Sequence, residues 1–460
     1  MIDTALIRSK VLEQAVMGEL SVEFDSNVDS LIELREASNR NVVETKNEVP
    51  YELKEGWHWF ALSELGSDDK HSFADGPFGS NLKKEHYTEN AEVRIIQLSN
   101  VGELGWKNEN VRYTTFEHLV TIQRSEVKAG NIVIAKMMPA GRAIIVPDID
   151  EKYVLSSDCV KFVPCEFLNT EYLCYAINSS MFRKQVLQDV HGIGRERTSL
   201  SKLKTYLLPI PCRAEQDYIV EKINKAYEQL ASLDILQTQY SSDLEVLKSK
   251  IIDAGIQGKL TEQLPEDGTA EELSKNHIDD IINQEEKILD IPSNWSWIKL
   301  GWAMEIERGG SPRPIKAFVT DADDGINWIK IGDVAKDGKY IYQTKEKIKP
   351  GGEQKSRKVY PGDFLLTNSM SFGRPYISKI EGCIHDGWLL LRNTNELFDL
   401  DYLYWLLSSG YAFKQFSKKA AGATVDNLNK DKVASAVIPL PPLSEQKRIA
   451  NVLEEIMTKL

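Results

Sequence analysis

Two stretches of the chain, LPIPCRAEQ at residues 208–216 and IPLPPLSEQ at residues 438–446, repeat one another about 230 residues apart. Both contain two prolines separated by one residue, and both end in the same Glu-Gln pair just before a helical pattern. The interval is much longer than the roughly 20–50 residues typical of solenoid repeats. The sequence therefore predicts a duplicated domain, with two similar but unequal modules on one chain.

Other segments repeat in the same order around these two proline-containing stretches, which we call the proline exits because each lies at the end of a module. VKAGNIVIAKMMPAGRAIIV at 127–146 matches VYPGDFLLTNSMSFGRPYIS at 359–378, and each module opens on a Trp-x-Trp, at Trp57 and at Trp295. SKVLEQAVMGEL at 9–20 resembles SKIIDAGIQGKL at 249–260. The N-terminus is thus similar to the far end of the helix that follows the first module.

Length and composition are those of a globular protein with several domains. The chain has 460 residues, of which 42% are hydrophobic and 27% charged, and this length accommodates two to four domains. No apolar run approaches the roughly 20 residues of a membrane span. The five cysteines show no CxxC pair, so we expect reduced, mostly buried thiols in a cytoplasmic protein.

The negative charge is concentrated between the modules. The formal net charge is −13, but residues 13–55 carry −7 and residues 261–290 carry −8. The rest of the chain is close to neutral and has local basic clusters. The overall acidity therefore does not argue against a nucleic-acid partner for the modules.

Each module changes from strand-like to helical patterns along its length. Strands are predicted at 93–101 and 131–135 in the first module and at 326–334 and 363–367 in the second. A helical pattern follows in each, at 169–187 and at 399–416, with Asn, Thr or Asp at its start. We expect α+β modules, each a mixed α/β domain with a curved antiparallel sheet.

A long helix is predicted after the first module, from roughly residue 215 to 258. Apolar residues recur there at heptad spacing, with Gln237 in one position of the seam. The alternative is an amphipathic helix lying on a domain. The residues expected to form the seam or to contact a partner, including two in the start of the same pattern near the C-terminus, are Ile223, Leu230, Leu233, Tyr240, Leu244, Leu247, Ile251, Leu453 and Ile456.

The two chain ends suggest a circular arrangement. The second module ends in the start of the same helix, and residues 4–20 resemble its far half. We therefore expect the two ends to form a broken copy of the long helix, packed antiparallel to it as a coiled coil with pseudo-twofold symmetry. The predicted order is an N-terminal half-helix (1–20), an acidic linker (21–50), module 1 (51–212), the spacer helix (213–260), a second acidic linker (261–290), module 2 (291–442) and the start of the second spacer helix (443–460).

Catalytic and cofactor motifs are absent from the sequence. There is no GxxxxGK[ST] phosphate loop, no HExxH, no GxSxG and no Asn/Asp-Pro-Pro-aromatic tetrad of an amino-methyltransferase. The histidines are scattered, and we interpret His385-Asp386 as structural. A nuclease is not excluded by composition alone.

Three loops in matching positions of the two modules carry polar and basic residues. They are FADGPFGSNLKKE (73–85) with ERGGSPRPIK (307–316), the Gly130–Arg142 segment with its second copy, and HGIGRERTSLSK (191–202) with KKAAGATVDNLNK (418–430). Such side chains suit base edges and phosphates, although any one of them could be ordinary solvated surface. The candidate DNA contacts are Ser80, Asn81, Lys83, Lys84, Lys136, Arg142, Arg195, Arg197, Ser311, Arg313, Lys316, Asn368, Ser369, Ser371 and Arg374.

These features together resemble the specificity subunit of type I restriction-modification systems. The resemblance rests on the proline exits, the helices that follow them, the GEL and GKL helix ends, and the DGPFGSNLK and GGSPRP openings, and it extends over essentially the whole chain. It implies two target recognition domains that each bind one half of a bipartite, asymmetric DNA site, with the helices as spacer and as docking surface for two methyltransferase subunits.

The resemblance also implies a division of labour. S-adenosylmethionine would be bound by the methyltransferase partners, ATP and Mg by an additional restriction subunit, and no cofactor or metal by this chain. Three alternatives remain: a specificity subunit of a methylation-only or other methyl-based phage-defence complex, a nuclease or methyltransferase in its own right, and a coiled-coil scaffold that binds no DNA.

Overall fold

The computed structural model describes residues 1–22, 49–188, 197–273, 289–335, 338–368, 373–418 and 428–460. The chain divides into two compact units, Met1–Thr238 and Gln239–Leu460, each considered by itself below. Within the described residues, no helix is long and apolar enough to cross a membrane.

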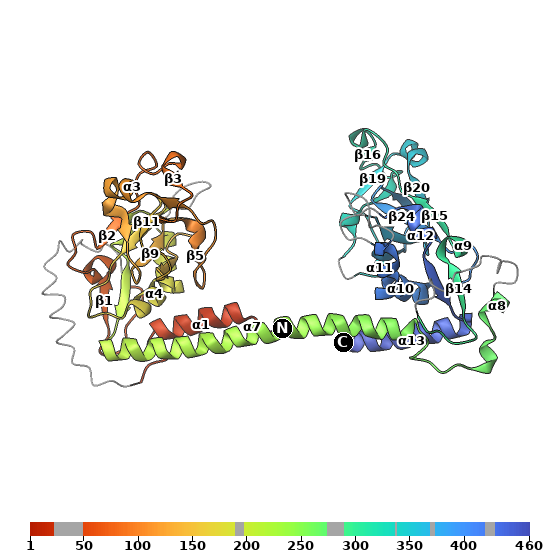
Figure 1. Cartoon of the computed structure of the whole chain (residues 1–460), viewed down its shortest axis with the longest axis horizontal. Helices are drawn as coiled ribbons and strands as arrows, with labels where there is room; N and C mark the ends of the chain where they lie inside the picture. Colours follow the sequence, from red (N-terminus) through yellow and green to blue (C-terminus); the bar gives the residue numbers. More distant parts are fainter. Residues whose placement is uncertain (23–48, 189–196, 274–288, 336–337, 369–372, 419–427) are drawn as a thin grey trace. The chain divides into compact units, whose positions relative to one another are not determined.

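Unit 1 combines short strands with helices (Figure 1). Its strands are β1 (His58–Ala61), β2 (Phe73–Asp75), β3 (Tyr87–Thr88), β4 (Val93–Ile96), β5 (Val101–Gly102), β6 (Gly105–Trp106), β7 (Tyr113–Thr114), β8 (Glu126–Val127), β9 (Ile132–Ala135), β10 (Ala143–Ile145), β11 (Tyr153–Leu155), β12 (Cys159–Phe162) and β13 (Leu207–Ile210). Its helices are α1 (Thr4–Val16), α3 (Phe116–Thr121), α4 (Thr170–Asn178), α5 (Ser180–Gln188), α6 (Leu200–Leu203) and α7 (Arg213–Gly255), the last of which continues into unit 2.

Unit 2 has the same kinds of element in nearly the same order. Its strands are β14 (Ser296–Lys299), β15 (Glu305–Arg308), β16 (Val319–Thr320), β17 (Ile326–Ile329), β18 (Tyr340–Ile341), β19 (Glu346–Ile348), β20 (Arg357–Val359), β21 (Phe364–Thr367), β22 (Pro375–Ser378), β23 (Gly382–Ile384), β24 (Trp388–Arg392) and β25 (Val437–Leu440). Its helices are α8 (Ala270–Leu273), α9 (Leu300–Ala303), α10 (Leu400–Ser408), α11 (Gly410–Lys418), α12 (Lys430–Ala434) and α13 (Leu443–Lys459).

Short 3-10 helices connect several strands in both units. They are η1 (Leu62–Leu65), η2 (Lys84–His86), η3 (Leu98–Asn100) and η4 (Gln123–Ser125) in unit 1, and η5 (Pro265–Asp267), η7 (Ile315–Ala317), η8 (Ile331–Asp333) and η9 (Pro350–Lys355) in unit 2. The predicted strands at 93–101 and 326–334 are therefore shorter than expected, since η3 and η8 occupy their second halves.

The two larger sheets of unit 1 have counterparts in unit 2 with the same strand order. The order β3-β7-β4-β11-β8 in unit 1 matches β16-β19-β17-β23-β20 in unit 2, and β10-β9-β12-β2 matches β22-β21-β24-β15, to which unit 2 adds β18. The structure confirms two similar mixed α/β modules. The sheets are not wholly antiparallel, because β4 pairs with β11, β17 with β23 and β18 with β22 in parallel. Parallel partners are joined by long crossovers, which local strand patterns do not reveal.

The repeated tryptophan and proline motifs form one strand pair in each unit. Trp59 lies opposite Pro209 in the β1–β13 pair, and Trp297 lies opposite Pro439 in the β14–β25 pair. Trp57 and Trp295 are both buried. The equal register explains why the Trp-x-Trp and the proline exit recur together although they lie far apart in the sequence.

The Glu of each Glu-Gln pair is a buried acceptor at the start of the helix that follows. Glu215 accepts a hydrogen bond from Trp57 Nε1 at 2.9 Å, and Glu445 accepts one from Trp295 Nε1 at 2.7 Å. The segments after the GEL and GKL helix ends reach the same carboxylates, through the Ser21 hydroxyl in unit 1 and the Gln263 amide in unit 2. In each unit, the Glu carboxylate therefore links three segments: the tryptophan at the beginning of the module, the helix that follows the module, and the segment after the GEL or GKL helix end.

The Gln of each pair positions the helix that closes the module. Gln216 accepts from the backbone N–H of Asn169 at 2.9 Å, and Gln446 from that of Asp399 at 2.8 Å. Asn169 and Asp399 are the N-caps of α4 and α10.

The helical pattern at the end of each module forms two helices instead of the one predicted. The breaks are at Ser179, between α4 and α5, and at Ser409, between α10 and α11. Each serine hydroxyl donates to a carbonyl three residues earlier and accepts from an N–H three residues later. Serine competes with the helix for backbone hydrogen bonds in this way.

The long helix agrees with the sequence pattern, and a second helix packs antiparallel to it in each unit (Figure 1). In unit 1, Arg8 of α1 forms an ion pair with Asp234 at 2.8 Å, and Gln237 accepts from the backbone N–H of Ile2. In unit 2, Leu453 of α13 lies against Gly255. That α1 and α13 continue one another stays a prediction.

The heptad seam of α7 is buried only in part. Ile223 and Leu230 are buried, whereas Tyr240 and Leu247 are 63% and 45% exposed. The sequence places both in the seam, but in the described chain no helix covers the middle of α7. The cysteines also differ from expectation, since Cys159 and Cys383 are buried and the other three only half-buried.

Candidate nucleic-acid interface

The three matched loops meet at one place in unit 1. We call them loop 1 (75–84), loop 2 (136–142) and loop 3 (189–199), the last of which is described only from residue 197. Lys136 of loop 2 forms an ion pair with Asp75 of loop 1, with 2.8 Å between Nζ and Oδ1. Its carbonyl accepts from the N–H of Thr198 in loop 3 at 2.9 Å, and its own N–H donates to the Asp158 carbonyl. Arg197 completes the cluster through an ion pair of 3.0 Å with Asp158.

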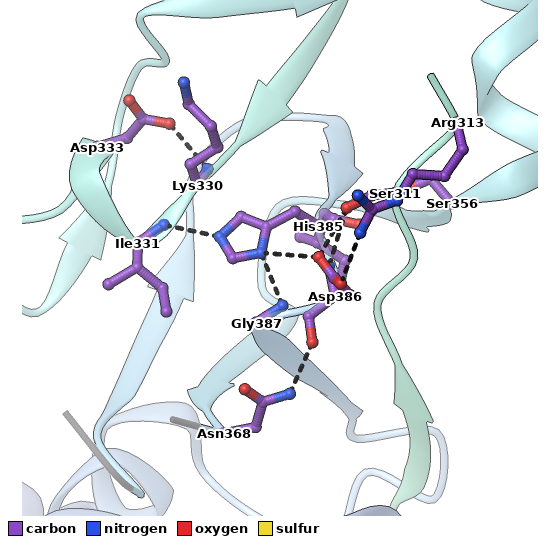
Figure 2. Close-up of polar contacts among 11 residues, drawn as sticks. Ser311, Arg313, Lys330, Ile331, Asp333, Ser356, Asn368, His385, Asp386 and Gly387 are labelled. Atoms are coloured by element: carbon purple, nitrogen blue, oxygen red, sulfur yellow. Dashed lines mark hydrogen bonds and ion pairs between the residues drawn. The ribbon is translucent and has the colours of Figure 1, made fainter. Parts of the chain in front are cut away.

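In unit 2, loop 1 is 308–316, loop 2 is 368–374 and loop 3 is 419–429, of which residues 369–372 and 419–427 lie outside the described residues. Their described parts make the same backbone contacts as in unit 1. The N–H of Asn368 donates to the Gly387 carbonyl, and its carbonyl accepts from Leu428, both at 3.0 Å. The Asn368 side chain donates to the Asp386 carbonyl at 2.7 Å. Figure 2 shows Asn368, Asp386 and Gly387 together with Ser311 and Arg313 of loop 1.

In both units, a glycine allows loop 1 to lie close to the turn that follows a parallel strand, β11 in unit 1 and β23 in unit 2. A Cβ at Gly76 would lie 1.8 Å from the Ser156 carbonyl oxygen, and one at Gly309 would lie 2.1 Å from that of His385. No side chain fits at either distance. These glycines account for the recurrence of the DGP and GGS openings in the sequence.

His385 has the contacts of a structural residue, in agreement with its sequence interpretation. Its Nδ1 accepts from the N–H of Gly387 at 2.7 Å and its Nε2 lies 3.1 Å from the N–H of Ile331 (Figure 2). Burial lowers the pKa of His385. The Asp386 carboxylate, 3.7 Å from Nδ1, acts in the opposite direction but does not outweigh the burial.

The carboxylate of Asp386 organises loop 1 of unit 2. It accepts from the Ser311 hydroxyl at 2.7 Å, and Arg313 lies 3.4 Å away. The Ser311 hydrogen bond lowers the pKa of Asp386, with smaller contributions that include the charge of Arg313. The carboxylate is therefore ionised at neutral pH.

The candidate DNA contacts divide into exposed and enclosed residues. The exposed ones are Ser80, Asn81, Lys83, Lys84, Arg197, Arg313 and Lys316. Ser311, Arg142 and Arg374 are half-buried, and Lys136 and Asn368 are buried. Arg195, Ser369 and Ser371 lie outside the described residues.

The enclosed candidates hold the loops in place. Arg142 donates from Nη1 to the Val101 carbonyl at 3.1 Å, and burial lowers the pKa of its guanidinium. Lys136 binds Asp75 of loop 1, and Asn368 binds the strand turn at Asp386. Direct base contact by these three residues stays a prediction, and the structure gives each of them a supporting role.

Sequence reasoning overlooked the acidic partners and two exposed apolar residues. Asp75 and Asp158 form the ion pairs of this loop cluster, with Lys136 and Arg197, and a carboxylate alone suggests no DNA contact. Phe78 in loop 1 and Met138 in loop 2 are 83% and 74% exposed. The apolar character of Phe78, which follows Gly76-Pro77 and precedes Gly79, was the available signal. In the described part of the chain, no group of three or more His, Cys, Asp or Glu side chains could hold a metal ion.

The duplicated fold and the paired loop clusters define a class of protein with two related recognition modules on shared helices. Residues 80–238 and 292–460 each match the family described as Type I restriction modification DNA specificity domain. The two matches cover more than half of the chain. The chain therefore belongs to this family and is a DNA sequence-specificity subunit of the type I restriction-modification class.

Individual relatives and solved structures agree with this assignment. The chain is 21% identical to the type I restriction enzyme EcoEI specificity subunit of Escherichia coli, over 98% of this chain and 88% of the relative. The EcoDI specificity subunit of Escherichia coli is 22% identical over 63% of each chain. The crystal structure of the HsdS subunit from Thermoanaerobacter tengcongensis has a TM-score of 0.52 at 21% identity, covering 90% of this chain and 92% of that one.

A second solved structure has a similar fold. It comes from work on complex assembly and conformational transition of the type I R-M system, and it has a TM-score of 0.61 at 20% identity, covering 89% of this chain and 92% of that chain.

Proposed function

We propose that each module of this chain reads one half of a bipartite, asymmetric DNA site. The observation that carries the proposal is the loop cluster: in both units, loops 1 and 2 are held by the same backbone hydrogen bonds on the segment that follows β11 or β23, and loop 2 also contacts loop 3, whereas the side chains differ. One scaffold with two sets of side chains is suited to reading two different sequences. The exposed lysines and arginines would contact phosphates or guanine, and the serines and asparagines would contact other base edges or the backbone.

The chain acts in this proposal without catalysis of its own. It binds no cofactor, and its partners supply the chemistry: two methyltransferase subunits would use S-adenosylmethionine, and restriction subunits would use ATP and Mg. The middle of α7, with Tyr240 and Leu247 exposed, is the surface we assign to the methyltransferase partners. A large exposed apolar patch is typical of an interaction surface. The complex would act in the cytoplasm.

The proposal is tested by methylome mapping. The chain would be expressed with its neighbouring methyltransferase in a bacterial host that lacks adenine methylation, and modified bases would be mapped by long-read sequencing. We expect adenine methylation at a two-part motif with a fixed gap. The control omits only this chain and should show no such motif.

The outcome also separates the alternatives. If the complex assembles but no motif is methylated, the coiled-coil scaffold gains support and the DNA-reading proposal fails. Methylation or nicking by the isolated chain would identify an enzyme instead. Methylation of the motif without ATP-dependent cleavage, in the presence of every subunit encoded alongside, would indicate a methylation-only system.

A further inference from the structure

Lys339 is an enclosed lysine of unit 2 that lies outside the three loops. It directly precedes β18, the strand that unit 2 adds to its sheet. Its side chain is only 14% exposed, and a lysine is almost never enclosed without a partner. Its Nζ lies 2.7 Å from the Asp401 carboxylate in α10 and 3.3 Å from the Glu454 carboxylate in α13. One ammonium group therefore joins the edge of the module's sheet to two helices.

Three aromatic rings surround the same ammonium. Its Nζ lies 4.9 Å from the ring centroid of Tyr404, 5.4 Å from that of Tyr340 and 5.7 Å from that of Trp405. A cation within about 6 Å of a ring centroid is attracted to the ring, and more strongly where water is partly excluded. Burial by itself lowers the pKa of Lys339, but the hydrogen bond and the charge of Asp401 outweigh it and raise the pKa. The side chain is therefore a cation at neutral pH.

The backbone that carries Lys339 is held by the neighbouring strand. The Lys339 carbonyl accepts from the N–H of Ile377 in β22, and the Ile341 carbonyl accepts from the N–H of Lys379, both at 2.9 Å. Ile341 itself is buried. The lysine thus extends from a fixed sheet edge, and its ion pairs link the position of the sheet to that of the helices.

Unit 1 has a different arrangement at the corresponding place. Counted from the matched Glu-Gln pairs, Asp401 and Glu454 correspond to Glu171 and Asn224. There the Asn224 amide donates to the Glu171 carboxylate at 2.9 Å, and no lysine or arginine of the described residues forms an ion pair with Glu171. A cavity of about 660 Å³ lies beside them, between α1, α4, α7 and the β5–β6 turn. The ammonium contact is therefore a property of module 2 that the repeated scaffold does not require.

The lysine binds α13 at a distance from the contacts at the beginning of that helix. The Glu445 carboxylate holds the first turn of α13 and lies nine residues before Glu454, which corresponds to about 13 Å along a helix. Between them, Ile449 and Leu453 pack into the core of the module, and such apolar contacts are not directional. Two polar contacts separated along a helix fix its direction relative to the module, whereas one alone lets it tilt.

We propose that Lys339 is a positioning residue that sets the angle between module 2 and α13, and thereby keeps the gap of the bipartite DNA site at one length. The inference rests on the proposed DNA-reading function, in which α13 is part of the spacer. A change in this angle would move the loops of module 2 along the DNA. One base pair occupies about 3.4 Å along the DNA axis, so a small tilt is enough to favour a different gap.

The test measures which gaps the complex accepts. The full chain is assembled with its methyltransferase partner, and initial rates of adenine methylation are measured on duplexes that carry the motif found by methylome mapping. The duplexes have the wild-type gap, one base pair fewer or one base pair more. The readout is the ratio of the rate at the wild-type gap to the rate at an altered gap, because a variant that is merely less stable lowers all the rates by the same factor.

We expect Lys339→Met to reduce this ratio about five- to tenfold, the range for losing one partly shielded ion pair together with its aromatic contacts. Lys339→Arg keeps the charge and should retain most of the wild-type ratio. Glu454→Gln should lower the ratio as well. Combining it with Lys339→Met should add little, because both changes remove the same contact.

Lys345→Met is the matched control. Lys345 is an exposed lysine of the same module, and its ammonium donates to the Gly332 carbonyl at 2.8 Å. It forms no ion pair with α10 or α13 in the described part of the chain. This variant should keep the wild-type ratio of rates.

Three results would overturn the inference. If Lys339→Met keeps the wild-type ratio, or loses activity equally at every gap, Lys339 stabilises the module without setting the gap. If the wild type methylates all the gaps equally, there is no fixed gap for Lys339 to set, although DNA reading stands. If no motif exists at all, both the proposed function and this inference fail.

Discussion

At the scale of single residues, one carboxylate explains why the Glu-Gln motif occurs twice. Glu445 is fully buried and accepts from the Trp295 indole at 2.7 Å and from the Thr261 hydroxyl at 3.2 Å. Its removal leaves buried donors without an acceptor, which is more costly than losing one ordinary hydrogen bond.

Glu445→Ala should therefore destabilise unit 2 by about 3 kcal/mol. Urea unfolding followed by tryptophan fluorescence would measure this, and Glu215→Ala should have the same effect on unit 1. Glu455→Ala is the control, since Glu455 is on the exposed side of α13 and pairs with Lys459. Equal midpoints for Glu445→Ala and Glu455→Ala would contradict the role of the buried carboxylate.

At the scale of elements, a second carboxylate holds the beginning of α13. Asp267 in η5 accepts from Arg448 Nη1 at 2.7 Å and from the Ser444 hydroxyl at 2.8 Å. The Arg448 hydrogen bond is the main reason that the pKa of Asp267 falls from 3.8 to about 2. A carboxyl whose folded-state pKa is lowered stabilises the fold above its unfolded pKa, and this contribution is lost as the pH falls through the folded value.

The stability advantage of the wild type over Asp267→Asn should therefore shrink between about pH 4 and pH 2. We expect the change to be about 1 kcal/mol, because solvent reaches the Arg448 side of the pair and screens it. Denaturation curves of both proteins across this range would measure it. Asp323→Asn, at an exposed position, should follow the wild-type pH dependence, and a constant difference for Asp267→Asn would refute the assignment.

At the scale of the whole molecule, α7 is, among the helices of the described residues, the one that continues through both units. In the proposed function it acts as a spacer, so the gap of the DNA site should follow its length. Residues 231–237 are a poor choice for shortening it, because Asp234 and Gln237 bind α1. Residues 238–244 form a heptad beyond these contacts.

Deletion of residues 238–244 should shorten the gap of the methylated motif by about three base pairs. Seven residues at 1.5 Å per residue correspond to about 10 Å, and one base pair occupies about 3.4 Å. Methylome mapping of the variant complex would show the new gap. An unchanged motif would exclude α7 as the spacer, and substitution of Thr238 and Ser242 by Ala, without deletion, should leave the gap as in wild type.

The sequence by itself determined the duplication, the long helix and the family, because each depends on patterns that are local or repeated within the chain. The strand pairs of the Trp-x-Trp and proline motifs, the parallel strand pairs and the helix breaks at Ser179 and Ser409 were decided by tertiary structure. They depend on hydrogen bonds between distant segments or on competition between side chain and backbone.

The candidate site divides in the same way. The sequence located the loops, but only the tertiary structure decided which of their side chains face solvent. Lys136 and Asn368 are drawn inward because carboxylate and carbonyl acceptors of other segments lie within reach, at Asp75 and at Asp386. Phe78 is left outside because Gly76 holds its turn against the Ser156 carbonyl. Exposure is a property of the folded neighbourhood, and residue type alone does not encode it.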